Sequence, residues 1–394
     1  MDMVYLDNAA STCPAPEVLE VTARTARDLF ANPASAHGAG AAAARALENA
    51  REGVAAALGA APAEVVFTSG GSEANALAML GVAARARGRH VVLTAIEHPA
   101  VLRNAERLAK QGGFEMTLVS VGPTGVVDPA AVVAAVRPDT AIVAVMLVNN
   151  EIGTIQPVQA VARALDARAP GLGAQRPHLH VDAVQAFGLV SFRPAALGAD
   201  SLAISGHKIH GPKGTGALWL RRGARVSALW DGGGQERGMR SGTENLPGVV
   251  GFAQAAALAI AARDAGGTSL MSGLRDELES RIRDTIAGAI PTVAGAERAP
   301  HISSMALPKL PAEPLLHAME ARGVFVSAGS ACASKTRGPS HVLKAIGIDD
   351  STAVLRFSLS RYTTADDITT AVAALGAAVV EIGNHTTAKP RRNG

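Results

Sequence analysis

The sequence predicts an α/β fold, with a large domain built on a mostly parallel seven-stranded sheet covered by helices, and a smaller α+β domain at the C-terminal end. Three observations support this. The 394 residues exceed the usual size of a single hydrophobic core, so two domains are expected. Short β-branched runs alternate with alanine-rich helical runs between residues 65 and 220. Hydrophobic residues make up 48% and charged residues 18%, which indicates a packed globular chain rather than a disordered one.

Seven short strand-like segments predict the sheet, at residues 65–68, 90–94, 116–121, 141–148, 178–181, 201–204 and 216–220. Four helical runs lie between them, at residues 74–86, 99–111, 128–136 and 158–169. Strands that alternate with helices form a parallel sheet with both faces covered. Ligands of such sheets bind at the carboxyl ends of the strands, so the functional residues are expected there.

The rest of the chain is expected to connect this sheet to the second domain. Residues 230–242 are too rich in glycine for a regular element, which predicts a long functional loop. A helical stretch over residues 248–287 follows it. We expect residues 13–260 to form the large domain, and residues 1–12 together with 261–394 to form the small domain.

Composition and charge exclude several classes of protein. The net charge of +3 owes much to the tail at residues 389–392, and no basic surface with interleaved aromatic residues is apparent, so no nucleic acid partner is expected. Two cysteines make no disulfide framework and indicate a reducing compartment. The first residues lack the pattern of a signal peptide, and the apolar run at 248–262 is interrupted or too short to span a bilayer. We therefore expect a cytoplasmic protein without a membrane partner.

Lys208 stands in an unusual setting for a lysine. It enters a glycine-rich turn directly after the apolar run 201–204, in the order Ser205, Gly206, His207, Lys208. Asp182 similarly follows the predicted strand at 178–181. An amine that can form a Schiff base, together with an acid that can hold a pyridinium proton, is the minimum equipment for pyridoxal phosphate chemistry.

A candidate phosphate site lies between the predicted strand at 65–68 and the helix that follows. Residues 68–75 contain Gly71 and Ser72 in a glycine-rich turn that opens the helix. Free backbone N–H groups and the positive end of the helix dipole favour an anion there, and Ser72 adds a hydroxyl. The alternative is an ordinary turn in which Ser72 caps the helix.

Two further polar positions follow predicted strands. His98 comes shortly after the strand at 90–94, where it could stack on a cofactor ring or move a proton; the alternative is a helix cap or a surface residue. Asn149 and Asn150 follow the strand at 141–148, where an amide could bind a substrate carboxylate or a cofactor phenolate. The alternative is a turn that uses asparagine for local hydrogen bonds.

Arg356 interrupts an otherwise apolar strand pattern at residues 354–360. Arginine is rarely buried without a partner, and its guanidinium offers two parallel hydrogen bonds to a carboxylate. An amino acid is therefore a reasonable substrate. The alternative is an internal salt bridge.

Cys332 lies in the run of small residues at 327–334, which suits a mobile loop. A thiol with a pKa of about 8.5 is only a few per cent ionised at neutral pH, but that fraction is strongly nucleophilic. The alternative is a buried structural cysteine, which a loop of glycine, serine and alanine accommodates poorly. Cys13 has no comparable setting and is expected to be inert. His207 and His210 lack further ligands at suitable spacing, so no metal site is expected.

Together these segments resemble the cysteine desulfurases, the NifS-like group of the class V, fold-type I pyridoxal phosphate enzymes. The resemblance runs nearly end to end and rests on motifs in a fixed order, at residues 5–10, 32–35, 180–182, 205–208, 240–243, 329–332 and 356–358. The spacing from Cys332 to residues 339–343 resembles the subgroup with the longer cysteine loop. Three departures are a serine at position 72 where many relatives have threonine, His210 in place of a frequent tyrosine, and a short C-terminus after the helical run 368–382.

The resemblance implies a role for each candidate. Lys208 would bind pyridoxal phosphate covalently, Asp182 would pair with its pyridine nitrogen, His98 would stack on the ring, and Gln185 would hydrogen-bond its phenolic oxygen. The phosphate would be held in the turn at Gly71 by Ser72, Ser205 and His207, and by Thr243 from a second subunit, which implies a homodimer with shared sites. Asn150 and Arg356 would bind the substrate carboxylate.

The activity implied by the resemblance is the conversion of L-cysteine to L-alanine. Lys208 would remove the Cα proton, and Cys332 would take the sulfur as a persulfide for an acceptor protein, such as an iron–sulfur scaffold or another sulfur-trafficking protein. The short C-terminus leaves delivery to a scaffold open. The alternatives are a selenocysteine lyase or another enzyme of the class V fold, and a sulfur-carrier subunit without catalysis.

Overall fold

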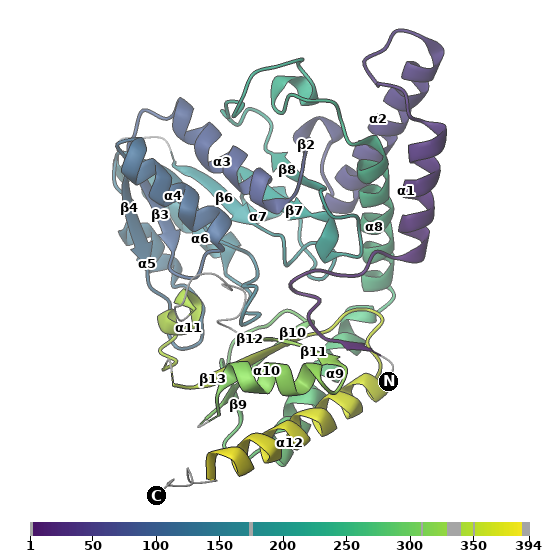
Figure 1. Cartoon of the computed structure of the whole chain (residues 1–394). Coiled ribbons are helices and arrows are strands. Elements are labelled where there is room, and N and C mark those ends of the chain that lie inside the picture. The colour runs from purple at the N-terminus through teal and green to yellow at the C-terminus, as the bar shows by residue number, and fades with distance from the viewer. Residues whose placement is uncertain (1–2, 173–175, 309, 329–339, 350, 388–394) are drawn as a thin grey trace, which may run out of the picture.

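The computed structural model describes residues 3–172, 176–308, 310–328, 340–349 and 351–387 (Figure 1). Its central sheet has seven strands, in the order β2 (Val65–Thr68), β8 (Gly216–Leu220), β7 (Ser201–Ser205), β6 (His178–Asp182), β5 (Thr140–Ala144), β3 (His90–Thr94) and β4 (Glu115–Val119). Strand β8 runs antiparallel to both of its neighbours, and the other pairs are parallel. The mostly parallel seven-stranded sheet expected from the sequence is confirmed.

Strand β5 is shorter than the apolar run that predicts it. It ends at Ala144, although the backbone N–H groups of Val145 and Leu147 still donate to the carbonyls of His180 and Asp182. The chain beyond β5 therefore stays beside β6 and leads to the turn at Asn149. Apolar residues continue to Val148 because this segment is buried in the core, not because it remains a regular strand.

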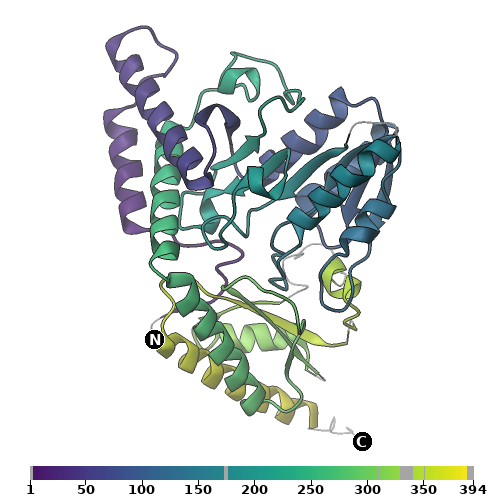
Figure 2. The same ribbon diagram turned by 180° about the vertical axis from the view of Figure 1, so that it is seen from behind.

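Helices cover both faces of the sheet. On one face lie α3 (Gly71–Arg85) and α4 (Pro99–Gln111), and on the other α5 (Pro129–Ala134), α6 (Val158–Arg168) and α7 (Pro194–Leu197) (Figures 1 and 2). Alternate residues of β3 divide between these layers: Val91 and Leu93 pack with α3 and α4, whereas Val92 packs in the core that includes α6. This two-residue alternation explains why the strand is apolar throughout.

Three long helices pack together beside the sheet: α1 (Pro16–Asp28), α2 (Gly38–Leu58) and α8 (Leu246–Asp264) (Figure 1). The expectation that the run at 248–262 is too short to span a bilayer is wrong on length, because α8 has 19 residues and is apolar enough to cross one. Its buried face, however, packs against α1 and α2, as a core helix of a globular domain does. The helical stretch expected over 248–287 is also divided: Gly266, at φ 87°, separates α8 from α9 (Gly267–Thr285).

The remaining strands form two small sheets. One is antiparallel, in the order β12 (Ser327–Ala328), β13 (Ala353–Ser358), β10 (Ile302–Leu307) and β9 (Ile290–Pro291). In the other, β1 (Val4–Tyr5) pairs in parallel with β11 (Val324–Phe325), which brings the start of the chain to this lobe. Helices α9, α10 (Ala312–Glu320) and α12 (Ala365–Thr387) pack on these strands, while α11 (His341–Ala345) packs with the core of the large sheet (Figure 1). The division at residues 12/13 and 260/261 stays a prediction.

Candidate active site

A cavity of about 610 Å³ opens where the parallel strands end, between the central sheet and the lobe that contains β13. It brings together ten of the residues singled out from the sequence: Gly71, Ser72, His98, Asn150, Asp182, Gln185, Ser205, His207, Lys208 and Arg356. Two others are not among them. Thr243 is exposed and does not line the cavity of its own chain, and Cys332 lies outside the described residues.

Lys208 projects its amine into this cavity from a short turn that follows β7. Its Nζ donates to the carbonyl oxygens of Ala9, at 2.5 Å, and Ala10, at 2.8 Å. These carbonyls belong to the segment between β1 and α1, which crosses from the small lobe to the large sheet. The N-terminal segment therefore forms one wall of the site, a role that the residue pattern alone did not reveal.

Asp182 is the last residue of β6 and is only 5% exposed. Its Oδ2 accepts a hydrogen bond of 2.7 Å from Asn75 Nδ2, and its Oδ1 accepts one of 3.0 Å from the backbone N–H of Val184. Such bonds stabilise the ionised form of a buried carboxylate. Asn75 was missed by the sequence reasoning, although it lies one helical turn after Gly71 and so on the same face of α3.

The opposite end of the cavity is suited to an anion. Helix α3 begins at Gly71, with Gly70 at the N-cap, so the alternative in which Ser72 caps the helix is wrong. A Cβ at position 71 would lie 2.5 Å from Val184 Cγ2, which requires glycine beside the cavity. Ser205 Oγ is fully buried and has no hydrogen-bond partner among the described residues. An unsatisfied hydroxyl beside the first N–H groups of a helix fits the phosphate of pyridoxal phosphate.

The loop 230–242 reaches this anion site through an ion pair. Arg240 Nε lies 2.9 Å from Oε1 of Glu73, which is in the first turn of α3. The Arg240 guanidinium and the Ser69 backbone oppose the effect of burial, and the pKa of Glu73 is lowered. Thr243, three residues further along the chain, is exposed.

His98 is a helix cap, as the alternative interpretation of the sequence expected, and its stacking on a cofactor ring stays a prediction. Its Nδ1 accepts a hydrogen bond of 3.1 Å from the backbone N–H of Ala100, so it caps α4, and its ring also lines the cavity. Burial lowers its pKa. The ring is therefore neutral at pH 7, and because Nδ1 accepts, its proton lies on Nε2.

The neighbouring Glu97 was not predicted. Its side chain is 1% exposed, and Oε1 accepts from Thr94 Oγ1 at 2.7 Å and from the backbone N–H of Met146 at 2.8 Å. Burial raises the pKa of Glu97 to about 8. It is therefore largely a neutral acid at pH 7, and it ties the turn after β3 to the chain after β5.

Gln185 connects the Lys208 wall with the small lobe. Its Nε2 donates to the Ala9 carbonyl at 2.8 Å, and its Oε1 lies 3.1 Å from Nε2 of His301. His301, also missed from the sequence, is 3% exposed, and burial lowers its pKa to about 3. A hydrogen bond from Gln185 to a cofactor phenolic oxygen stays a prediction.

Arg356 in β13 joins the two lobes. Its guanidinium donates to the backbone carbonyl of Asn150 and forms an ion pair with Asp7, both at 2.8 Å. The alternative of an internal salt bridge is thus confirmed, but Nε is buried without a partner among the described residues, which leaves a donor for a carboxylate. Asn149, by contrast, uses its side chain for the turn, accepting from the backbone of Glu151 and Ile152.

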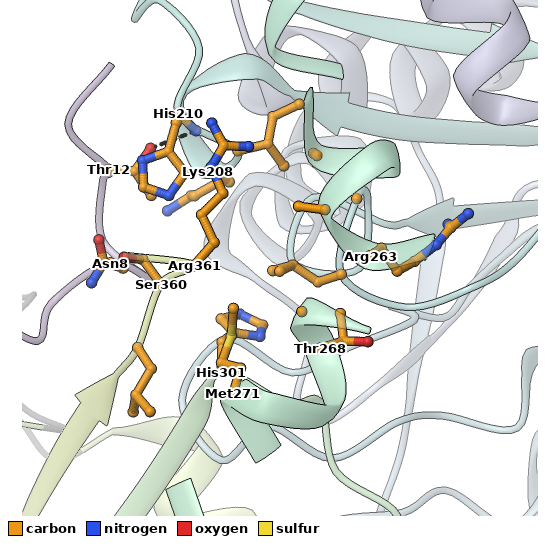
Figure 3. A pocket seen from close by; sticks show the side chains of 17 residues that line it. Asn8, Thr12, Lys208, His210, Arg263, Thr268, Met271, His301, Ser360 and Arg361 are labelled. Atoms are coloured by element: carbon orange, nitrogen blue, oxygen red, sulfur yellow. Dashed lines mark hydrogen bonds between the residues drawn. The ribbon is translucent and has the colours of Figure 1, made fainter. Parts of the chain in front are cut away.

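A second, much smaller cavity of about 40 Å³ is also lined by Lys208 (Figure 3). Figure 3 shows His301 and Met271 on one side of it and His210 with Thr12 on another. The His210 backbone N–H donates to Thr12 Oγ1, and its ring packs edge-on against Tyr362. This cavity has room for a few waters and not for a substrate. These contacts hold the His210 side chain beside the cavity.

The main cavity therefore combines an amine, a carboxylate and a neutral imidazole. Lys208, Lys213 and Arg356 line it against the carboxylates of Asp182 and Glu73. These cationic side chains, at separate positions in the lining, suit a ligand that carries both a phosphate and a carboxylate. Among the described residues, no cluster of three or more histidine, cysteine, aspartate or glutamate side chains could hold a metal ion.

Comparisons with known proteins agree with this geometry. The family model described as "Aminotransferase class-V" matches residues 4–370. A protein named "Cysteine desulfurase" from Trichormus azollae is 40% identical over 371 residues, which is 92% of this chain and 90% of that protein. A solved structure of a "NIFS-LIKE PROTEIN" superposes with a TM-score of 0.89 at 35% identity, covering 96% of this chain and 100% of the other. Another, "SspA in complex with cysteine", has a TM-score of 0.78 at 32% identity and covers 91% and 99%.

Proposed function

The chain belongs to the class-V aminotransferase family and is a cysteine desulfurase that depends on pyridoxal phosphate, and from this premise we propose how its own residues divide the work. The single observation that carries the proposal is the main cavity, in which Lys208 and Asp182 share one wall with the anion site at the start of α3. The amine, the acid and the phosphate cradle are the three contacts that hold a pyridoxal ring in place.

We propose that Lys208 attaches the cofactor, which supplies an electron sink for the pair released when the substrate's Cα–H bond breaks. Asp182 pairs with the pyridine nitrogen, His98 stacks on the ring, and Gln185 donates to the phenolic oxygen. Ser72, Ser205 and His207 bind the phosphate beside Gly71. Ser205 Oγ then gains the partner that it lacks among the described residues.

The transfers of the Cα proton are assigned to Lys208, and the contact with the face of the ring is assigned to His98. Lys208 Nζ takes the Cα proton of cysteine and returns a proton to the product, which requires the amine to leave the Ala9 and Ala10 carbonyls. His98 carries its proton on Nε2, and because its lowered pKa keeps the ring neutral, it can stack on a cationic pyridine ring without charge repulsion.

The carboxylate of cysteine binds at Asn150 and Arg356, where the buried Nε of Arg356 is the available donor. The reacting thiolate is assigned to Cys332, which lies outside the described residues. Its sulfur forms a bond with the substrate sulfur while the substrate's Cβ–S bond breaks, and the electron pair of that bond stays with the carbon fragment. Protonation of this fragment yields L-alanine and leaves a persulfide on the enzyme.

Sulfur acceptors follow from the family, but which acceptor this chain serves is a separate proposal. The persulfide passes to an acceptor protein, for iron–sulfur cluster assembly or another sulfur pathway.

We also propose that the chain is a homodimer in which Thr243 completes the phosphate site of the partner subunit. The exposure of Thr243 and the link from Arg240 to Glu73 support this. The scarcity of cysteine supports a cytoplasmic location.

The decisive experiment separates the cofactor from the sulfur chemistry. Cys332→Ala is expected to keep the visible absorbance of the bound cofactor but to lose persulfide formation and sulfur transfer from cysteine. Lys208→Ala is expected to lose that absorbance. Cys13→Ala is the matched control, because Cys13 is a free and exposed cysteine. Desulfuration by Cys332→Ala at the rate of the unmodified enzyme would show that the persulfide mechanism is wrong.

A further inference from the structure

Beside Asp182, a row of polar side chains runs from Asn75 in the cavity wall into the core of the sheet. Asn75 Nδ2 donates to Asp182 at 2.7 Å, and Asn75 Oδ1 lies 2.8 Å from Nε2 of His180. The row continues from His180 Nδ1 to Ser201 Oγ at 2.8 Å, and from Ser201 Oγ to His178 Nε2 at 2.7 Å. Four hydrogen bonds thus link His178 to Asp182.

This row runs through the most buried part of the sheet. Asn75 is 1% exposed, and His180 and Ser201 are not exposed at all. His178, His180 and Asp182 alternate along β6 and so share one face, while Ser201 lies on the neighbouring β7 and Asn75 on α3, the helix that covers that face. Buried polar groups in an otherwise apolar layer destabilise the fold unless every one of them is satisfied.

The direction of each hydrogen bond follows from chemistry. Because ionised Asp182 can only accept, Asn75 must present its NH₂ to Asp182 and its carbonyl to His180. His180 Nε2 must then carry the proton. Burial lowers the pKa of His180 to about 3, so the ring is neutral and its Nδ1 accepts from the Ser201 hydroxyl. Ser201 Oγ in turn accepts from His178 Nε2.

We propose that Asn75, His180, Ser201 and His178 form a one-directional hydrogen-bond chain, in which every donor points toward Asp182 and which holds that carboxylate ionised and aimed at the pyridine nitrogen. Aligned donors polarise one another, so the last bond, onto Asp182, is stronger than an isolated amide bond. The four residues are positioning residues that act through Asp182. The inference rests on the proposed pairing of Asp182 with the cofactor.

The hydrogen-bond chain has a spectroscopic consequence. A proton held on the pyridine nitrogen adds positive charge to the cofactor, and this lowers the proton affinity of the nitrogen that Lys208 contributes. The pH at the midpoint of the cofactor's absorbance change reports that affinity. The other titratable groups near Asp182 are Glu97, His98 and Lys208, and the substitutions below leave them unchanged.

The test is an absorbance titration of the cofactor-loaded full-length enzyme. Asn75→Leu and His180→Leu are expected to raise the midpoint by about one pH unit, the equivalent of one hydrogen bond to a charged group. His180→Gln keeps a donor for Asn75, so its midpoint is expected to lie much closer to that of the unmodified enzyme than the midpoint of His180→Leu does. Ser201→Ala removes only the two hydrogen bonds farthest from Asp182, and is expected to give a smaller shift of the midpoint in the same direction.

The matched control is His90→Leu. His90 is also a fully buried histidine of the central sheet, with both ring nitrogens hydrogen-bonded, to Thr140 and Thr117. Its replacement is expected to lower stability without moving the midpoint. If His180→Leu and His180→Gln both titrate with the midpoint of the unmodified enzyme, the chain does not act on Asp182 and the proposal is overturned. Failure of the unmodified enzyme to show cofactor absorbance would instead contradict the proposed function.

Discussion

Glu97 illustrates, at the scale of a single residue, how burial beside an active site changes the behaviour of an ordinary side chain. Sequence reasoning selected its neighbour His98 because a histidine after a strand has obvious chemistry. Glu97 carried no such signal, because its neutral state depends on the β3 and β5 segments that surround it. Only three-dimensional packing removes water from this carboxyl group.

The raised pKa of Glu97 predicts a pH dependence of stability. Its folded pKa of about 8 lies above the ordinary value of 4.5, so its contribution to stability is complete below pH 4.5 and is lost as the pH rises through 8. Glu97→Gln, which cannot ionise, is expected to flatten the fall in unfolding free energy across this range. Urea unfolding at several pH values measures it, with the exposed Glu52→Gln as the control. Parallel pH profiles for Glu97→Gln and the unmodified protein would contradict the assignment.

At the scale of elements, the alternation of apolar strands with helices was sufficient to predict the central sheet. Residues 65–68, 90–94 and 216–220 coincide with β2, β3 and β8 because these strands are buried on both faces and therefore read as unbroken apolar runs. The strand predicted at 141–148 was too long for the same reason, because residues 145–148 are buried without being part of a strand. The break between α8 and α9 was missed because a single glycine in the left-handed conformation leaves the helical periodicity of the sequence unchanged.

Glycines at helix contacts provide a test at this scale. A Cβ at Gly251 in α8 would lie 2.8 Å from the Pro212 ring and would also clash with Thr22 of α1. Gly251→Ala is expected to destabilise the protein by about 1–3 kcal/mol through overpacking. At Gly273 in α9 a Cβ would meet no atom within 4 Å, so Gly273→Ala is expected to be stabilising. Thermal unfolding compares the two; a Gly251→Ala protein that melts no lower than the unmodified one would contradict close α1–α8 packing.

At the scale of the whole molecule, the active site depends on segments that are distant in sequence. The Ala9 and Ala10 carbonyls, Lys208 and Arg356 meet only because β1 pairs with β11 in the small lobe while the segment after it crosses to the large sheet. Arg356 then ties Asp7 to Asn150 across the same junction. Movement of one lobe relative to the other would alter the wall that holds the lysine amine.

The proposed sharing of Thr243 between subunits predicts complementation. Co-expression of a Lys208→Ala subunit with a Thr243→Val subunit gives mixed dimers with one complete site if Thr243 acts on the partner. About a quarter of normal activity is then expected from random pairing, although each variant alone is impaired. If Thr243 acts within its own chain, mixing restores nothing. Desulfurase activity of the co-purified mixture, compared with each variant alone, decides between the two arrangements.

The sequence by itself determined the α/β class, the strand-end positions of Lys208, Asp182 and His98, and a family resemblance that the comparisons confirm. These features are local, since they depend on hydrophobic periodicity and on a few residues adjacent along the chain. Only the tertiary structure decided the partners of those residues: Asn75 and His180 beside Asp182, and the Ala9 and Ala10 carbonyls on Lys208. The physical reason is that hydrogen bonding and burial depend on distances between segments far apart in sequence, which no local pattern encodes.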